Sequence, residues 1–381
     1  MMSQRSKREL IENIHPRYLK ATKAGKTQIL DEFVATTGCH RKYAIRVLKH
    51  GPQPKGLHPA VGRSKIYQGE VVQVLEQIWE ICGRICSKRL HPFLPEITSV
   101  LERCHELSLA EDTKTLLLGM SRSTIDRCLK QARFTSGPQG LSTTKPGTLL
   151  KAAIPIRTFT PWEDEHPGFL EIDLVAHCGS TTAGTYLNTL TTTDLATGWT
   201  ECLALPNKTQ VAVSQAIQTL REHLPFPLLG LDSDNGSEFI NETLLRYCQD
   251  EHITFTRSRP YQKNDQAHVE QKNWSVVRHT VGYDRLETPE ELALLNAIYT
   301  DLRLYINFFQ PQLKLVGKER IDGKTVRTYD RATTPFRRVL ALDALPLEVK
   351  ARLTAQYVQL NPVTLRASID ARVGQLWKII R

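Results

Sequence analysis

Three acidic clusters in the middle of the chain have the residue types and spacing of a site that handles a hard cation. Glu171 and Asp173 lie inside the apolar run FLEIDLVA, Asp232 and Asp234 belong to LDSDNG, and Glu270 lies in AHVEQKNW. A carboxylate inside an apolar strand is costly to bury unless a cation or hydrogen-bond donors compensate it. We therefore expect these clusters to share a function.

The predicted geometry lets the clusters meet. Strand alternation puts Glu171 and Asp173 on one face of a strand. Glu270 opens a helix that carries Trp274 and Val277 on the same side, so the carboxylate can point at a sheet that its helix packs against. Carboxylates converging from two strands and a helix suit Mg²⁺ or Mn²⁺, and two such ions can clamp both oxygens of a phosphoryl displacement. Taken singly, any one of these residues could instead be an ordinary surface carboxylate or a helix cap without a role in metal binding.

The elements that would hold this site change character near residue 165. Helical periodicity before that point gives way to runs rich in β-branched and aromatic residues, separated by glycine-containing turns. Three hairpin-like strands followed by alternating helices and strands predict a mixed α/β sheet. We expect strands at 169–178, 185–195, 198–205, 227–231 and 253–255, helices at 209–223 and 237–250, and covering helices at 267–281 and 289–308.

Two helical segments precede this region. Helix 26–37, a break at Gly38 and basic helix 41–49 form a helix-turn-helix pattern, in which the second helix enters the major groove. A plain helical hairpin is the alternative. We expect the second helix to bury Ala44, Ile45 and Leu48 and to expose a basic face of Arg41, Lys42, Arg46 and Lys49.

A second helical block follows a linker rich in proline and glycine at 51–64. Its expected helices are 70–82, 95–107 and 121–133, the last capped by Ser121 or Ser123. Arg122 and Arg127 would lie on the exposed face of that last helix, which makes it a second candidate recognition helix. The segment 134–160 contains no acidic residue and could follow a DNA backbone as an extended connector.

Charge is distributed unevenly along the 381 residues, whose formal net charge is +10. Residues 1–67 hold 14 Lys+Arg against 4 Asp+Glu, whereas residues 160–310 hold 10 against 21. Basic arms around an acidic middle suit a polyanionic partner such as DNA, because lysine and arginine release the counterions condensed on phosphates. An unevenly charged surface without such a partner is the weaker interpretation.

Neither a membrane nor disulfides are expected. No apolar run approaches the roughly 20 residues that span a bilayer, and a charged helical pattern follows the basic start where a signal peptide needs an apolar core. We therefore expect an intracellular, bacterial, nucleoid-associated protein whose eight cysteines are mostly buried thiols. Zinc is a minor alternative, without any CxxC pair to favour it, and its candidate ligands are Cys82, Cys86, His91, Cys104 and His105.

The acidic motifs together resemble a known family. EIDLV, LDSDNGSEF, the polar loop RSRPYQKND and QAHVEQKN follow one another as in the DDE transposases and retroviral-type integrases, and above all the bacterial insertion-sequence transposases with an integrase core. Between Asp234 and Glu270 lie 35 residues, a spacing typical of that family. The resemblance covers about 165–310. It implies an RNase H-like fold in which Asp173, Asp234 and Glu270 form a catalytic, metal-binding triad.

The resemblance also implies roles for neighbours of the triad. Lys272 and Asn273 match positions that contact DNA ends in the family, and Lys263 lies in the loop that handles the attacked strand, beside Tyr261 and Gln262. Glu171 and Asp232 would support the ligands, and Glu238 would lie in the first turn of helix 237–250. The N-terminal region lacks the His/His/Cys/Cys zinc pattern of retroviral integrases.

These observations predict a DNA transposase. It would bind terminal inverted repeats, cleave the 3′ ends and join them to target DNA by metal-dependent transesterification, working as a dimer or larger oligomer. A DNA-binding regulator with an inactive core and an RNase H-like nuclease are the alternatives. The predicted domains are 1–66 (helix-turn-helix), 67–134 (second helical domain), 135–160 (linker), 161–310 (catalytic core) and 311–381 (a basic hairpin at 314–329, then helices at 346–359 and 362–380).

Overall fold

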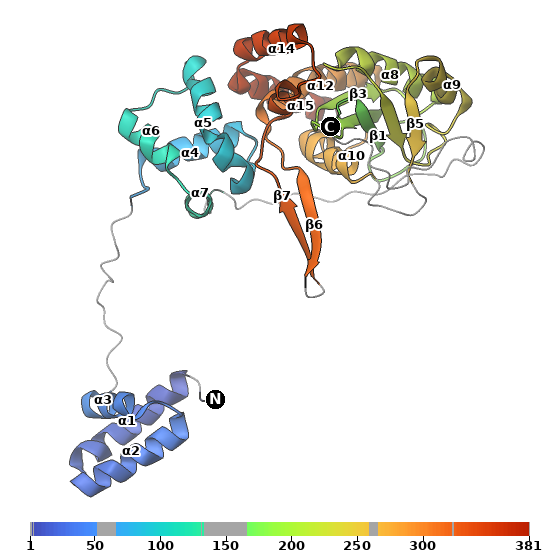
Figure 1. Ribbon diagram of the computed structural model, residues 1–381. Helices are drawn as coiled ribbons and strands as arrows, with labels where there is room; N and C mark the ends of the chain where they lie inside the picture. The colour runs from blue at the N-terminus through green and yellow to red at the C-terminus, as the bar shows by residue number, and fades with distance from the viewer. Residues whose placement is uncertain are drawn as a thin grey trace. The chain divides into compact units, whose positions relative to one another are not determined.

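The protein consists of two compact units, Met1–Ile66 and Tyr67–Arg381 (Figure 1). The computed structural model describes residues 2, 4–51, 66–130, 132, 166–258, 266–321 and 324–380. Most of the predicted linker at 51–64, the connector at 134–160, and the loop with Tyr261, Gln262 and Lys263 lie outside these residues. The three C-terminal domains predicted from the sequence fall within the second unit, and their separate boundaries stay a prediction.

The first unit is a three-helix cluster with its own core. Its helices are α1 (Gln4–Lys20), α2 (Lys23–Thr37) and α3 (Arg41–His50). Gly38 ends α2 with a φ of +66°, a left-handed conformation that glycine adopts without steric cost. Phe33, Ala44 and Leu48 are buried, as expected, but Ile45 is 41% exposed. The prediction for Ile45 was wrong because a helix this short buries only a narrow stripe.

The second unit begins with four helices, α4 (Glu70–Ile81), α5 (Ser87–Arg103), α6 (Glu111–Leu118) and α7 (Arg122–Cys128). Ser121 caps α7, as predicted, by accepting a hydrogen bond from the Thr124 backbone N–H. The start predicted for α5 was wrong: the helix begins eight residues before Pro95, which lies inside it together with Pro92. Tertiary packing outweighs the two prolines, since the first turns of α5 bury Leu90 and Phe93.

A five-stranded sheet in the order β3-β2-β1-β4-β5 forms the centre of this unit. β1 pairs antiparallel with β2 and β2 with β3, whereas β4 and β5 run parallel to β1. This mixed order is that of the RNase H-like fold, so the predicted fold class is confirmed. The strands are β1 (Phe169–Ala176), β2 (Asn188–Asp194), β3 (Thr200–Leu205), β4 (Gly230–Ser233) and β5 (Thr254–Arg257).

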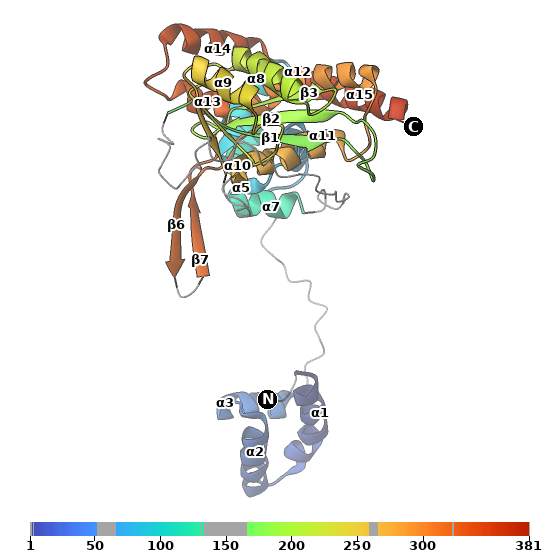
Figure 2. The ribbon, with the colours of Figure 1, turned by 90° about the vertical axis from the view of Figure 1, so that its right-hand side faces the viewer.

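Helices cover both faces of the sheet. Figure 2 shows α8 (Gln210–His223) and α9 (Glu242–Asp250) on one side of β1 and β2, and α10 (Ala267–Lys272) on the other. The helix expected at 267–281 is not uniformly α-helical: a π-helical turn, η1 (Asn273–Arg278), separates α10 from α11 (His279–Val281). Periodicity alone could not show this wider turn, because it changes the spacing by one residue over a single turn.

The long helix α12 (Pro289–Phe309) closes the outer edge of the sheet. The side-chain amide of Asn307 both accepts from the Thr200 N–H (2.9 Å) and donates to the Thr200 carbonyl (2.8 Å). Asn296 makes the same pair of bonds with Ala204, at 2.8 and 3.2 Å. The free edge of β3 therefore finds its hydrogen-bond partners within the chain and is not open to another strand.

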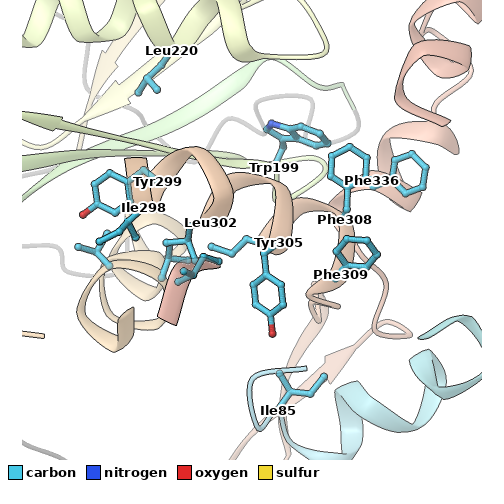
Figure 3. Packing of buried hydrophobic residues seen from close by; sticks show 14 of the residues in the cluster. Ile85, Trp199, Leu220, Ile298, Tyr299, Leu302, Tyr305, Phe308, Phe309 and Phe336 are labelled. Atoms are coloured by element: carbon cyan, nitrogen blue, oxygen red, sulfur yellow. The ribbon is translucent and has the colours of Figure 1, made fainter. Parts of the chain in front are cut away.

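The helical block and the core share one apolar centre along α12 (Figure 3). Trp199 packs edge-on against Phe308, and the Tyr305 hydroxyl donates to the Ile81 carbonyl at 2.6 Å. Beyond α12, the basic hairpin and the last helices form as expected, with α13 as an addition. These elements are β6 (Leu315–Ile321), β7 (Lys324–Tyr329), α13 (Pro335–Leu340), α14 (Leu347–Gln359) and α15 (Pro362–Ile380).

Candidate active site

Asp173 and Asp234 lie side by side where β1 and β4 stop pairing. The parallel register matches Glu171 with Asp232 and Ile172 with Ser233, so the next residues along the two strands are the two aspartates. β4 ends at Ser233, and Asp234 follows directly. The end of this strand therefore lies two residues later in the chain than the sequence pattern indicated, and Asp234 follows directly after it.

Electrostatics links Asp173 to both other carboxylates of the predicted triad. Burial, and next the negative charge of Asp234, raise the pKa of Asp173 to about 7, and the charge of Glu270 acts in the same direction. Hydrogen bonds from the Leu174 N–H (2.8 Å) and the Asn273 amide (2.6 Å) oppose this rise. The charges of Asp234 and Glu270 thus both act on Asp173.

Glu171 fixes the helix that carries Glu270. Its buried carboxylate accepts hydrogen bonds from the backbone N–H groups of His268 and Val269, both at 3.0 Å. The first N–H groups of a helix have no partner within the helix, and a carboxylate also suits the positive end of the helix dipole. β1 therefore supplies both Asp173 and the anchor of α10.

Asp232 is fully buried two residue pairs before the two aspartates in the register of β1 and β4. Its carboxylate accepts a 2.6 Å hydrogen bond from the Thr256 hydroxyl, and its carbonyl oxygen accepts one from the Gln266 amide at 3.3 Å. These contacts join β4 to β5 and to the residue before α10. The structure thus places Asp232 among the groups that hold the site, away from its open end.

Glu238 is an acidic neighbour that the sequence pattern did not identify as part of the site. The prediction that Glu238 lies in the first turn of a helix was wrong. The helix α9 begins only at Glu242, after a series of turns that contains Glu238. A methyl group on Gly236 would meet the carboxylate carbon of Glu238 at 2.8 Å and an oxygen of Asp234 at 2.9 Å. Burial, and then the charge of Glu238, raise the pKa of Asp234, while Lys208 opposes this.

The two residues after the candidate glutamate have different surroundings. Asn273 gives its side-chain amide to Asp173. Lys272 is only 8% exposed and lines a cavity that opens between α10 and the β2–β3 turn. Burial, followed by the charge of Arg89, lowers the pKa of Lys272 to about 7. Their predicted contacts with DNA are therefore not evident from the described surface.

The basic residues predicted to bind DNA on the flanks lie on exposed helix faces. On α3, Arg41 forms an ion pair with Asp31, Arg46 stacks over the Tyr43 ring at 5.4 Å, and Lys42 is exposed. On α7, Arg122 is exposed, while Arg127 donates to Ser123 and Thr124 of its own helix. The exposed positions of these side chains leave them accessible to a polyanion.

Within the described residues, no three His, Cys, Asp or Glu side chains are arranged closely enough to hold a metal ion. This applies to the zinc alternative near Cys82 and Cys86 as well as to the acidic centre. Of the cysteines, Cys82 is buried, Cys86 is exposed and Cys104 is half-buried, and each is a free thiol. Glu270 is exposed on α10, in contrast to the largely buried aspartates.

Comparison with known proteins places this site in a family. Residues 163–263, which include Asp173 and Asp234, match the family described as "Integrase core domain". The "Uncharacterized protein y4rM" of Sinorhizobium fredii (strain NBRC 101917 / NGR234) is 41% identical over 339 residues, covering 88% of this chain and 96% of the relative. This chain belongs to the same family as y4rM. It is a protein of the DDE transposase/integrase type, as the acidic motifs predicted.

The integrase core implies a polynucleotidyl transferase type of activity with DNA as the substrate. A crystal structure of the catalytic core domain of BIV integrase shares 19% identity, with a TM-score of 0.27, over 37% of this chain and 83% of that chain. The family match ends before Glu270, so the third carboxylate depends on the geometry described above. No described helix is long and apolar enough to cross a membrane.

Proposed function

We propose that this integrase-core protein is a DNA transposase that binds terminal inverted repeats, cleaves the 3′ ends and joins them to target DNA by transesterification. The proposal is supported by the charges of Asp234 and Glu270, which both act on Asp173 within an integrase-type core. In this proposal the three are the catalytic residues. They come from a strand, a strand end and a helix of an integrase-type core.

Asp173 and Asp234 of the proposed donor set suit a hard divalent cation, and Glu270 would have to approach them to complete the set. Asp173 and Asp234 are neighbouring carboxylates with raised pKa values, and a cation between them would relieve both burial and mutual repulsion. Asp173, Asp234 and Glu270 would hold Mg²⁺ or Mn²⁺, with two ions proposed. When bound, such ions stabilise the charge on the attacking and leaving oxygens of a phosphodiester.

The remaining residues of the site act by positioning. Asn273 holds one oxygen of Asp173, and Leu174 holds the other through its backbone N–H, so this carboxylate is fixed before any ligand arrives. Glu171 sets the start of α10 and with it the position of Glu270. Preorganised groups of this kind cost no rearrangement during reaction.

Binding of DNA is assigned to the basic parts of the chain. The acidic core repels a polyanion, so affinity must come from the flanks and from any bound cations. We propose α3 with Arg41, Lys42 and Arg46, α7 with Arg122 and Arg127, and the loop residue Lys263 as DNA contacts. Because two ends are joined in one reaction, we propose a homodimer or larger oligomer on DNA.

The test is a cleavage and joining assay on DNA from both flanks of the gene, with purified full-length protein. Wild type should release labelled 3′ ends and join them to a target only with Mg²⁺ or Mn²⁺, whereas Asp234→Asn should lose at least about 100-fold in rate. Glu242→Gln is the matched control, since Glu242 pairs only with Arg246 on the exposed face of α9. Specific binding without any metal-dependent cleavage would instead favour a DNA-binding regulator with an inactive core.

A further inference from the structure

A cavity beside the sheet, on another side of α10 from Glu270, gathers positive charge from distant parts of the chain. Its volume is about 70 Å³, and it lies between the β2–β3 turn, α10, α5, α13 and the segment before β6. Four of these elements each contribute a basic side chain. The four are Arg89, Lys272, Lys314 and Arg338.

Acidic groups compensate this charge only in part. Asp194 is the one acidic residue on the cavity wall, and the charge of Lys314 acts on it. Its carboxylate also accepts hydrogen bonds from the Gly168 N–H (2.8 Å) and from the N–H and hydroxyl of Thr197 (2.7 and 2.6 Å). Asp330, outside the wall, pairs with Arg338 at 2.7 Å. Within the described part of the chain, Arg89 has no ion-pair partner.

The buried ammonium group of Lys272 is the strongest indication that the cavity binds an anion. Its side chain is more than nine-tenths buried, and no ion pair with an aspartate or glutamate is found for it within the described residues. Arg89 and Arg338 lie close enough to act on its charge. Burying an ammonium group next to other cations is unfavourable unless an anion shares the site.

We propose that this cavity binds a phosphate group. Arginine forks and lysine ammonium groups are the usual ligands of phosphate oxygens. A single water molecule needs roughly 10–15 Å³ of cavity volume measured in this way. A cavity of about 70 Å³ therefore has room for one tetrahedral oxyanion. The phosphate would also join the helical block, through Arg89, to the core. The proposal does not depend on the proposed transposase activity.

Heat denaturation of the full-length protein in EDTA tests the pocket, with sodium phosphate compared to sodium chloride at equal ionic strength. Wild type should gain about 2–4 °C in Tm from phosphate at roughly tenfold its dissociation constant. Arg89→Gln should lose most of this gain. Lys88→Gln, at an exposed neighbouring position outside the cavity wall, should keep it.

Lys272→Met gives a second, independent readout. It should raise the Tm in chloride, because an uncompensated buried charge is removed, and should abolish the gain from phosphate. The proposal is overturned if phosphate stabilises wild type no more than chloride does, or if Arg89→Gln gains as much as wild type. A failure of DNA cleavage has no effect on these measurements.

Titration with a short DNA duplex then identifies the source of the phosphate. If the pocket takes a backbone phosphodiester, Arg89→Gln should bind duplex at least about threefold more weakly than Lys88→Gln, and inorganic phosphate should compete beyond its ionic strength. The other outcome is that the two variants bind the duplex equally well, while phosphate raises the Tm of wild type and Lys88→Gln but not of Arg89→Gln. That result assigns the site to free phosphate.

Discussion

Asp173 has the surroundings that fit its proposed role as a metal ligand. It lies beside Asp234, and two hydrogen bonds hold its oxygens in place while burial and neighbouring charge raise its pKa to about 7. The apolar strand singled out Glu171 and Asp173 together, and the resemblance to the DDE transposases then selected Asp173. The sequence pattern could not identify Glu238, because the Asn-Gly turn suggested an early helix start, and only the folded turn brings that carboxylate back toward Asp234.

The raised pKa of Asp173 predicts the pH dependence of the metal-free protein. Between pH 4 and 7 the native carboxyl keeps a proton that the unfolded chain, with the ordinary value of 3.8, has lost. The free energy of unfolding should therefore fall as pH rises through this window, by up to about 4 kcal/mol from this group. Asp194, whose pKa burial raises to about 6, adds a decrease of the same sign.

Asp173→Asn should flatten this decrease without abolishing it, and should also remove the stabilisation that Mg²⁺ gives to wild type at pH 8. Urea denaturation in EDTA at several pH values measures both effects. An unchanged slope between pH 4 and 7 in the variant would show that Asp173 ionises normally and that its surroundings do not resemble those described.

At the scale of elements, the order of strands and helices follows from sequence periodicity, while their exact junctions do not. Runs rich in β-branched and aromatic residues indicated β1 to β3, and the basic Asp-Gly segment indicated the hairpin of β6 and β7. The turn at η1 and the late start of α9 depend on contacts made across the fold. Glu171 shows the same limit, since its bonds to α10 join residues 97 and 98 positions apart.

Glu171→Gln tests the link between β1 and α10. Glutamine keeps the size of the side chain but loses the charge that favours the helix start, so Glu270 should be held less firmly. We expect DNA joining to slow by about 10-fold to 100-fold, with DNA affinity within a factor of two of wild type. The rate of DNA joining and the affinity for DNA should be measured on the same preparation of the variant. A loss of DNA affinity with an unchanged joining rate would argue against a positioning role for Glu171.

Asn307→Leu tests the covered edge of β3. The substitution leaves the buried N–H and carbonyl of Thr200 without their partners, which should cost about 2–4 kcal/mol in the free energy of unfolding. Denaturant unfolding monitored by circular dichroism gives the value. Thr300→Leu, on the exposed face of α12, is the control and should change stability by less than about 0.5 kcal/mol.

At the scale of the whole molecule, the chain forms two compact units with separate cores. The first unit has its own core around Phe33 and Leu48, and the second holds the helical block, the sheet and the C-terminal helices in one cluster. The excess of basic residues in the first 67 positions and the acidic core were visible in composition. The pocket around Lys272 was not, because its four basic residues are spread from position 89 to 338.

Deletion of residues 1–66 should leave the remaining chain folded, because the two units have separate cores. The truncated protein should keep the circular dichroism and Tm of the core but lose at least about 10-fold in affinity for the proposed end DNA, with a smaller salt dependence. Filter binding at two salt concentrations measures this. Full affinity without these residues would remove α3 from the proposed interface.

The central claim is that Asp173, Asp234 and Glu270 act together on DNA, and Glu270 is the member that the family match does not reach. The decisive measurement is the Mg²⁺-dependent joining of a labelled 3′ end to target DNA by wild type and by Glu270→Gln. We predict joining by wild type, and a loss of at least about 100-fold in the variant while its DNA affinity and Tm stay unchanged. Joining at the wild-type rate by Glu270→Gln would contradict the account.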